Sequence, residues 1–479
     1  MTTDPYSQWR QWRLRGGCLE ESGRAVPPER LAQAIWRHQR LLRDRMSTLT
    51  GEPLRVLHPG FWNRGAGPDF RRAVIRIGEG LPVTGDVEVD ASRAQWAAHG
   101  HDRNPAYRGV VLHVVWTAGG EEAGPVPVMA LRPFLDASVE ELEVWLCSDA
   151  AMEPPLTSLG QCAPCLRQVA PSVTAAVLRQ AALVRFQGKA RELQARARQV
   201  GWEQSLWEGL FRGLGYRHNL WPMQALAELI PGLRERCPES GNLVLYWQAS
   251  LLGLAGFLPD DLTGRRRGAD SYLRQVWDYW WRERSAWERH LMPSGSWCRQ
   301  GLRPANHPHR RLALAAHWLA RKTFIGSLER WFGSGENDHR GSRELLALLQ
   351  APEDDFWSRH WTLGSEPMPR PRPLLGEQRL TDLAVNSLLP WFWVRAVAAN
   401  NPDLALRAER AFLGWPESQD NAVLRLCRQR LMGGQRQRHL RGAAGQQGLL
   451  QIVHDFCENA NALCTGCPFP EFLRRQDGS

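Results

Sequence analysis

The hydrophobic pattern of this chain changes its period once, and that change constrains the fold more than any other feature. Between residues 54 and 117, apolar and polar residues alternate in the runs LRVLHPG, FRRAVIRI, LPVTGDVEV and GVVLHVVWT, which is typical of strands. From residue 174 onward, apolar residues recur at helical spacing in runs such as TAAVLRQAALVRF and HRRLALAAHWLA. The sequence therefore predicts an α+β protein in which a mixed sheet comes first and an irregular all-helical part follows.

Breaks in the pattern predict three parts. We expect an α/β domain over residues 1–150, which includes an amphipathic helix in the run PPERLAQAIWRHQRLLRDRM. A proline-containing connector then leads into a helical domain over 151–430. A C-terminal helix with a cysteine cluster occupies 431–479. No fixed-period repeat is present in the sequence, which argues against a solenoid.

The composition allows a nucleic-acid partner and predicts no membrane span. The 479 residues include 60 Lys plus Arg against 50 Asp plus Glu, so the net charge is +10. Guanidinium groups suit phosphate, although a GC-rich genome also favours arginine codons. No run of about 18 apolar residues occurs, and MTTDPYSQWRQWRLRGG lacks the apolar core of a secretory signal. We therefore expect a cytoplasmic protein, in which most of the 23 tryptophans are helix-packing residues.

Three carboxylates stand where two neighbouring predicted strands begin or end. Asp69 follows the turn GAGP, and Glu88 and Asp90 come one strand later. Because side chains alternate along a strand, Glu88 and Asp90 share one face while Val87 and Val89 face the core. Burying carboxylates is costly without a partner, so the pattern predicts a site for Mg²⁺ or Mn²⁺, which prefer oxygen ligands. The alternative is a half-exposed hairpin whose acids only cap turns.

Residues 25–117 resemble the PD-(D/E)xK nuclease superfamily. The Pro-Asp pair at Asp69 matches its first motif, and the run from Glu88 to Asp90 stands where an acid-x-lysine is usual. The order helix, strands, helix, strand agrees as well, and Glu29 on the first helix corresponds to an extra acid of some members. The resemblance implies a metal-dependent nuclease.

The sequence departs from that superfamily at Asp90, which replaces the lysine that orients the attacking water. One interpretation assigns this task to a histidine, because His99 and His101 directly follow the acidic strand and imidazole serves as a base or a phosphate donor. Alternatively, Asp90 is a third metal ligand, or the domain is degenerate and does not cleave. His113 on the next strand is either a further site residue or a core histidine bonded to the backbone.

The segment WCRQGLRPANHPHRR leads from a loop into a predicted helix that begins near Pro308. Free N–H groups at a helix start favour anions. The segment therefore predicts a phosphate-binding loop for the substrate, formed by Arg303, Asn306, His307, Arg310 and Arg311. The alternative is a packing loop whose arginines pair with acids of the α/β domain.

The C-terminal run HDFCENANALCTGCPF predicts a second metal site. A Cys-x-x-Cys pair turns both sulfurs toward one ion, and the chain has ten cysteines but no predicted export signal that would favour disulfides. The predicted ligands of zinc or an iron–sulfur cluster are Cys457, Cys464, Cys467 and His454. Cys427 and the pair Cys162 and Cys165 are alternatives for the fourth ligand. The spacing resembles the first three cysteines of the iron–sulfur loop of endonuclease-three-type DNA glycosylases. The alternative is a set of reduced, buried thiols.

Taken together, HPGFWNRGAGPDF, GDVEVD, HGHDRNPAYRGVVLHVVW, LRPANHPHRR and the terminal Cys-x-x-Cys resemble the bacterial domain-of-unknown-function family 2851, from about Glu29 to Cys467. Membership implies an architecture and no activity. The function expected from the residues is a divalent-metal-dependent nuclease or DNA-processing protein. The alternative is a non-catalytic nucleic-acid-binding or scaffold protein with a degenerate nuclease-like domain.

Overall fold

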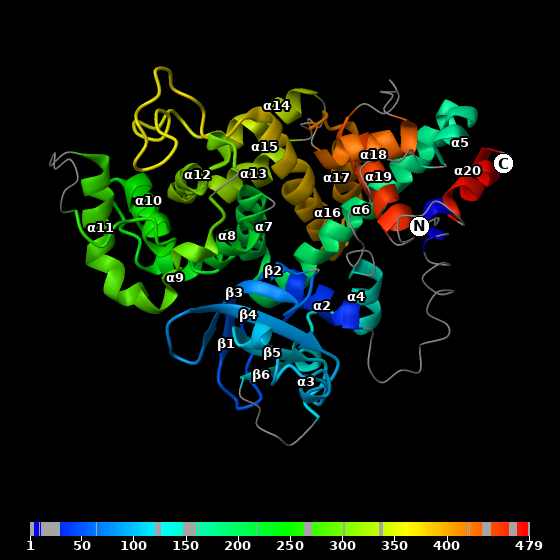
Figure 1. Ribbon diagram of the computed structural model, residues 1–479. Helices are drawn as coiled ribbons and strands as arrows, with labels where there is room; N and C mark the ends of the chain where they lie inside the picture. The colour runs from blue at the N-terminus through cyan, green and yellow to red at the C-terminus, as the bar shows by residue number, and fades with distance from the viewer. Residues whose placement is uncertain are drawn as a thin grey trace.

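The structure is a computed structural model of the chain. It describes residues 4–8, 10, 29–63, 65–119, 126–146, 160, 162–216, 218–262, 271–299, 302–334, 339–418, 420, 422–433, 442–458 and 467–477. A sheet lies on one side of a broad layer of helices (Figure 1). The predicted α+β class, with a mixed sheet first and helices after it, is confirmed.

Six strands form the sheet, in the order β1-β3-β4-β5-β6 with β2 paired to β3. They are β1 (Leu54–His58), β2 (Phe61–Trp62), β3 (Phe70–Ile77), β4 (Val83–Asp90), β5 (Val110–Val115) and β6 (Val128–Ala130). The pairs among β1, β3 and β4 are antiparallel, whereas β5 is parallel to both β4 and β6. The sequence predicted the four longer strands and missed β2 and β6, which are too short for alternation to show.

The connection between β4 and β5 contains a short helix, α3 (Gln95–Ala98), and a 3-10 turn, η1 (Pro105–Tyr107). Before the sheet lies α2 (Glu29–His38), and after it lies α4 (Val139–Leu146). The helix expected in the run from Pro27 is shorter than predicted, because Gln39 adopts a positive φ of 50° and ends it. Leu42, which belongs to the same run, therefore follows the helix.

One face of the sheet forms a hydrophobic core with α2. Val87 and Val89 of β4 are fully buried there, as predicted, together with Leu112 of β5. Leu31 and Ile35 of α2 belong to the same core, and they lie four residues apart on one side of the helix.

The opposite face of the sheet is shared between the helical part and the acidic residues. Leu57 and Val74 pack into the core of the helical part. Val74 lies opposite Thr84 of β4, and alternation along β4 then places Glu88 and Asp90 on this same face. Glu88 and Asp90 therefore project from the same face of the sheet that contacts the helical part.

The helical part begins at α5 and continues to α20 (Figure 1). Its helices are α5 (Cys162–Gln168), α6 (Pro171–Val200), α7 (Trp202–Gly215), α8 (Leu220–Ala227), α9 (Ile230–Glu235), α10 (Leu243–Leu254), α11 (Tyr272–Trp287), α12 (Pro308–Ala320), α13 (Phe324–Gly333), α14 (His339–Leu349), α15 (Glu377–Leu383), α16 (Leu389–Ala398), α17 (Pro402–Gly414), α18 (Ala422–Met432), α19 (Ala443–Ile452) and α20 (Phe469–Asp477). Trp207, Trp247, Trp318 and Trp391 are buried in its core, as expected for helix-packing tryptophans. Among the described helices, none is both long and apolar enough to cross a membrane.

Buried ion pairs join the two parts. Oε2 of Glu208 on α7 accepts from Arg43 Nη2 at 2.8 Å and from Arg196 Nε at 2.7 Å. Arg43 Nε also lies 3.2 Å from Oε1 of Glu228, at the end of α8. Removing one partner of a buried pair leaves an uncompensated charge, so this network fixes the sheet against α7 and α8.

Candidate metal centre on the sheet

Two of the predicted acids, Asp69 and Glu88, are bonded to the neighbouring strand at the point where β3 begins and β4 ends. The backbone nitrogen of Asp69 donates to Glu88 Oε2 at 3.0 Å, and that of Val89 donates to Asp69 Oδ2 at 3.1 Å. Phe70 lies opposite Val87 in the antiparallel register, which sets this spacing. The strand pairing therefore holds both carboxylates in fixed positions.

The helix α2 adds a fourth carboxylate to this group. Gln33 Nε2 donates to Glu29 Oε1 at 2.9 Å and to Asp69 Oδ1 at 3.0 Å. Gln33 is buried, and it lies one turn after Glu29 on the same side of the helix. One amide group thus links the helix acid to the strand acid. We call Glu29, Asp69, Glu88 and Asp90 the acidic cluster.

Three histidines surround Asp90. His113 Nε2 lies 2.9 Å from Asp90 Oδ2, and the parallel register pairs His113 with Glu88. His99 Nδ1 lies 3.5 Å from Asp90 Oδ1, and His101 Nε2 lies 3.3 Å from Glu88 Oε1. The ligand atoms of Asp90, His99 and His101 all lie within 4.8 Å of one another, a spacing that one metal ion can bridge.

Aromatic rings hold His101 in place. Its ring stacks on Tyr107 with centroids 3.9 Å apart and meets the edge of Trp96 at 5.3 Å. His101 Nε2 is buried without a hydrogen-bond partner among the described atoms, since its contact with Glu88 lacks hydrogen-bond geometry. A buried polar atom without a partner calls for an explanation, and a bound ion would supply it.

Burial and mutual repulsion make Glu29, Asp69 and Glu88 hard to ionise. Burial, followed by the charge of Asp69, raises the pKa of Glu88 to about 8. Burial also raises the pKa of Asp69 to about 7 although the Val89 N–H bond lowers it, and burial with the Asp90 charge raises that of Glu29. In the described part of the chain, no arginine or lysine forms an ion pair with these four groups. A divalent cation bound beside these carboxyl groups would favour their ionised form.

The donor set suits a borderline divalent ion. Carboxylate oxygens bind Mg²⁺ and Mn²⁺, while imidazole nitrogen shifts the preference toward transition metals. Burial lowers the pKa of His101, so its ring is neutral and its nitrogen can bind a metal ion. The predicted residues Asp69, Glu88, Asp90, His99 and His101 thus come together in one place.

The sequence did not predict three residues of this site, and it allowed two interpretations of His113. Gln33, Trp96 and Tyr107 were not predicted, although the position of Gln33 four residues after Glu29 was a usable signal. The interpretation of His113 as a core histidine bonded to the backbone is wrong for its ring, which bonds to the Asp90 side chain.

The predicted phosphate-binding loop is organised around main-chain carbonyls. Arg310 is buried and donates to the carbonyl oxygens of residues 357, 360, 372 and 373. Arg311 donates to Leu374 O at 2.9 Å and to Asn306 Oδ1 at 2.6 Å, and His307 Nδ1 accepts from the backbone N–H of His309. Arg303 is exposed. Among described residues, none of the five predicted positions bonds to the acidic cluster. The alternative, in which the arginines of the loop pair with acids of the α/β domain, is wrong for Arg310 and Arg311.

The cysteines predicted to bind a second metal fall partly outside the described residues, because Cys464 is not among them. Cys457 and Cys467 pack against a small core that contains Cys162 and Cys427. The helix α5 packs against α18 and α20, which brings the connector to the C-terminus. Nδ1 of His454 lies 3.3 Å from Asp455 Oδ1. The zinc or iron–sulfur site stays a prediction.

Fold and site define a two-part α+β protein with a carboxylate and histidine cluster on one face of its sheet. A family model described as "Protein of unknown function (DUF2851)" matches residues 29–419, and the chain belongs to this family. The predicted membership is confirmed, although the match ends before the cysteine cluster. Neither the curated proteins nor the solved structures gave a match. The comparisons do not support the resemblance to PD-(D/E)xK nucleases.

Proposed function

We propose that this protein is a divalent-metal-dependent hydrolase that cleaves phosphodiester bonds in nucleic acid. The observation that carries the proposal is the convergence of Glu29, Asp69 and Glu88 with Asp90 and its histidines, without an arginine or lysine paired to them among the described residues. Clustered carboxylates on rigid strands are a common way to hold a catalytic ion.

The residues themselves suggest a division of work. Asp90 and His101, whose ligand atoms lie within 4.8 Å of each other, would hold the ion together with Asp69 and Glu88, and His113 would fix the orientation of Asp90. When bound, the ion supplies a Lewis acid for the phosphate and lowers the pKa of water. The attacking water oxygen forms a bond to phosphorus, and the bond from phosphorus to the leaving oxygen breaks.

A histidine would take the proton of the water in place of the absent lysine. His99 is the best placed, because its side chain is 46% exposed and lies 3.5 Å from Asp90. A neutral imidazole accepts the proton, and solvent returns one to the leaving oxygen. His101, which is buried, would serve as a ligand instead.

Nucleic acid is the proposed substrate because positive charge lies beside the cluster. The chain carries a net charge of +10. Arg103 and Arg108 are exposed on the connection that also carries His99 and His101. Such side chains neutralise phosphates along a strand without reading its bases. They are better placed for this than Arg310 and Arg311, whose guanidinium groups bond to carbonyls.

The second candidate is a nucleic-acid-binding protein without catalysis. The observation in its favour is Asp90, which stands where a nuclease of the PD-(D/E)xK type has lysine and is engaged with His113. Under this alternative the acidic cluster is structural, and no ion is needed for binding.

A cleavage assay separates the candidates. Labelled single-stranded, duplex and branched DNA and RNA are incubated with Mn²⁺ or Mg²⁺ and with wild type, Glu88→Gln or Glu52→Gln. Glu52 is an exposed carboxylate outside the cluster and serves as the matched control. The proposal expects cleavage by wild type and Glu52→Gln but not by Glu88→Gln. Binding of nucleic acid without cleavage by any variant would favour the second candidate.

A further inference from the structure

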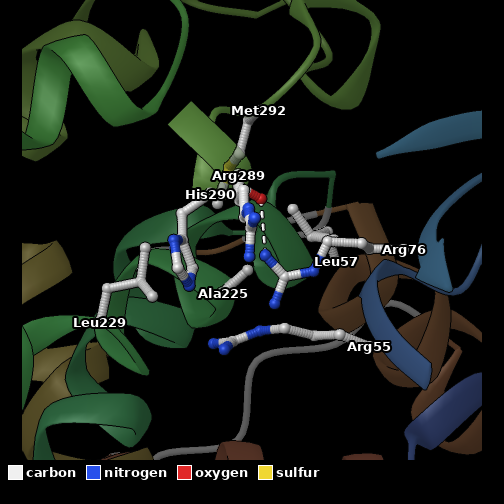
Figure 2. A pocket seen from close by; sticks show the side chains of 8 residues that line it. All are labelled: Arg55, Leu57, Arg76, Ala225, Leu229, Arg289, His290 and Met292. Atoms are coloured by element: carbon white, nitrogen blue, oxygen red, sulfur yellow. Dashed lines mark hydrogen bonds between the residues drawn. The ribbon is translucent and has the colours of Figure 1, made fainter. Parts of the chain in front are cut away.

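A pocket lies at the seam between the sheet and the helical part (Figure 2). Three arginines and one histidine line it, together with apolar side chains. The lining residues are Arg55, Leu57, Arg76, Ala225, Leu229, Arg289, His290 and Met292. They come from β1 and β3 on one side, and from α8, the following turn and the 288–292 segment on the other.

The positive charges in this pocket are only partly balanced. Arg76 Nη1 donates to the carbonyl oxygen of Arg289 at 2.6 Å, and no acidic partner of Arg76 is present among the described residues. Arg55 Nη2 lies 3.2 Å from Glu228, a carboxylate that also pairs with Arg43. Arg289 pairs with Glu79 in an exposed contact. The three guanidinium groups therefore have two carboxylate partners, Glu228 and Glu79, and Glu228 is shared with Arg43.

His290 adds an unused donor to the pocket. Its Nδ1 is buried without a hydrogen-bond partner among the described atoms. Burial, and then the charges of Arg76, Arg55 and Arg289, lower the pKa of His290 to about 4. The ring is therefore neutral near pH 7 and can present an N–H group. The same arginines that repel a proton would attract an anion.

We propose that this pocket binds a phosphate group, either inorganic phosphate or the phosphate of a small ester. Arg55, Arg76 and Arg289 supply forked donors that match phosphate oxygens, and His290 Nδ1 supplies a further one. The ligand bridges β3 and the 288–292 segment, so it neutralises the repulsion among the arginines and ties the sheet to the helical part.

Size and position favour a small ligand over a nucleic-acid strand. The empty space among the lining side chains is about 230 Å³, and this volume includes open solvent. The enclosed part is therefore well below the range of about 300–1,000 Å³ that is usual for drug-sized ligands. Asp69 precedes β3, whereas Arg76 lies near the other end of this eight-residue strand, which is about 25 Å long at roughly 3.3 Å per residue. The pocket is thus a separate site, and the inference does not rest on the proposed function.

Calorimetric titration in EDTA, at constant ionic strength, tests the proposal. Inorganic phosphate and a nucleoside 5′-monophosphate are titrated into wild type, Arg76→Gln, Arg289→Gln and Arg410→Gln. Arg410 is exposed on α17 and outside the pocket, so it is the matched control for loss of one positive charge. We expect binding to wild type and Arg410→Gln, and a loss of about tenfold or more in affinity for both pocket variants. Tighter binding of the monophosphate than of phosphate would identify an ester as the ligand.

Two results would overturn the proposal. One is the absence of phosphate binding to wild type in the millimolar range. The other is an equal loss in Arg410→Gln, which would show a general charge effect. If Arg76→Gln does not fold, Arg289→Gln keeps the test intact, because the Arg289 side chain is 61% exposed.

Discussion

The backbone nitrogen of Asp69 donates to the side chain of Glu88 at 3.0 Å, so the first residue before β3 is bonded to an acid near the end of β4. This bond keeps two carboxylates side by side on adjacent strands. The pairing of β3 with β4 sets the positions of these acids, which is why they stand within runs of β-branched residues.

The metal-free protein should lose stability as the pH rises from 5 to 8.5. The folded-state pKa values of Asp69 and Glu88 are raised to about 7 and about 8. The folded state therefore holds protons that the unfolded chain releases above about pH 4. The stabilisation from these bound protons is fully present below about pH 4, where the unfolded chain also holds them. It is lost as the pH rises through the folded-state pKa values of about 7 and about 8. We expect a decrease of several kcal/mol, measured by urea unfolding in EDTA.

The variant Glu88→Gln provides the comparison for that experiment. It keeps the size of the side chain but removes one ionisable group, so its stability should depend less steeply on pH. Equal slopes for wild type and variant would show that Glu88 does not titrate in this range.

His101 should determine which ion the cluster prefers. Its neutral imidazole favours Mn²⁺ or Zn²⁺ over Mg²⁺. His101→Gln should therefore weaken Mn²⁺ binding about tenfold or more, a loss that is common when a residue of a metal site is substituted. Mg²⁺ binding should change much less. His360→Gln, a substitution on the helical part where His360 Nδ1 bonds to Phe356 O, is the control and should leave both affinities unchanged. An equal effect of His101→Gln on both ions would argue against metal ligation.

Arg310 should be needed for stability. Its guanidinium group donates hydrogen bonds to four main-chain carbonyl oxygens, and its Cζ lies 4.8 Å from the centroid of the Trp361 ring. Arg310→Ala leaves these carbonyls without donors, which should cost about 3 kcal/mol or more in urea unfolding. The exposed Arg303→Ala should change stability by less than about 0.5 kcal/mol. A stable Arg310→Ala protein that has lost nucleic-acid affinity would restore the predicted binding role.

The cysteine cluster should retain a metal through purification. Elemental analysis is expected to find zinc, or iron with inorganic sulfide, and Cys467→Ser should reduce the metal content. Cys298→Ser is the control, because Cys298 lies outside the core that contains Cys162 and Cys427. A metal-free wild type whose thiols all react with a thiol reagent would favour the alternative of reduced cysteines.

Sequence patterns predicted much of the fold and the centre of the site. Alternation identified β3 and β4, and the position of acids on β4 predicted that Glu88 and Asp90 share a face. Gln33 was not predicted, because its role depends on α2 packing against β4 beside Asp69, a long-range contact that no local pattern encodes. The seam pocket was missed for the same reason, since Arg76 and His290 meet only when the helical part packs on the sheet.

The same limit applies to Arg310 and Arg311. Their cluster of positive charge at a helix start suggested phosphate, but the segment 357–374 supplies carbonyl oxygens that sequence alone could not place there. Local charge patterns predict a preference for anions or other acceptors, and packing decides which acceptor is present.

Titration of Mn²⁺ into metal-free protein at pH 8 tests the central claim most directly, with wild type and Glu88→Gln compared by calorimetry. If the acidic cluster is an ion site, wild type binds Mn²⁺ and releases protons from the carboxyl groups whose pKa values are raised. Glu88→Gln then binds Mn²⁺ at least about tenfold more weakly. Equal binding by both proteins, or none by either, would contradict the assignment of the acidic cluster as a metal centre.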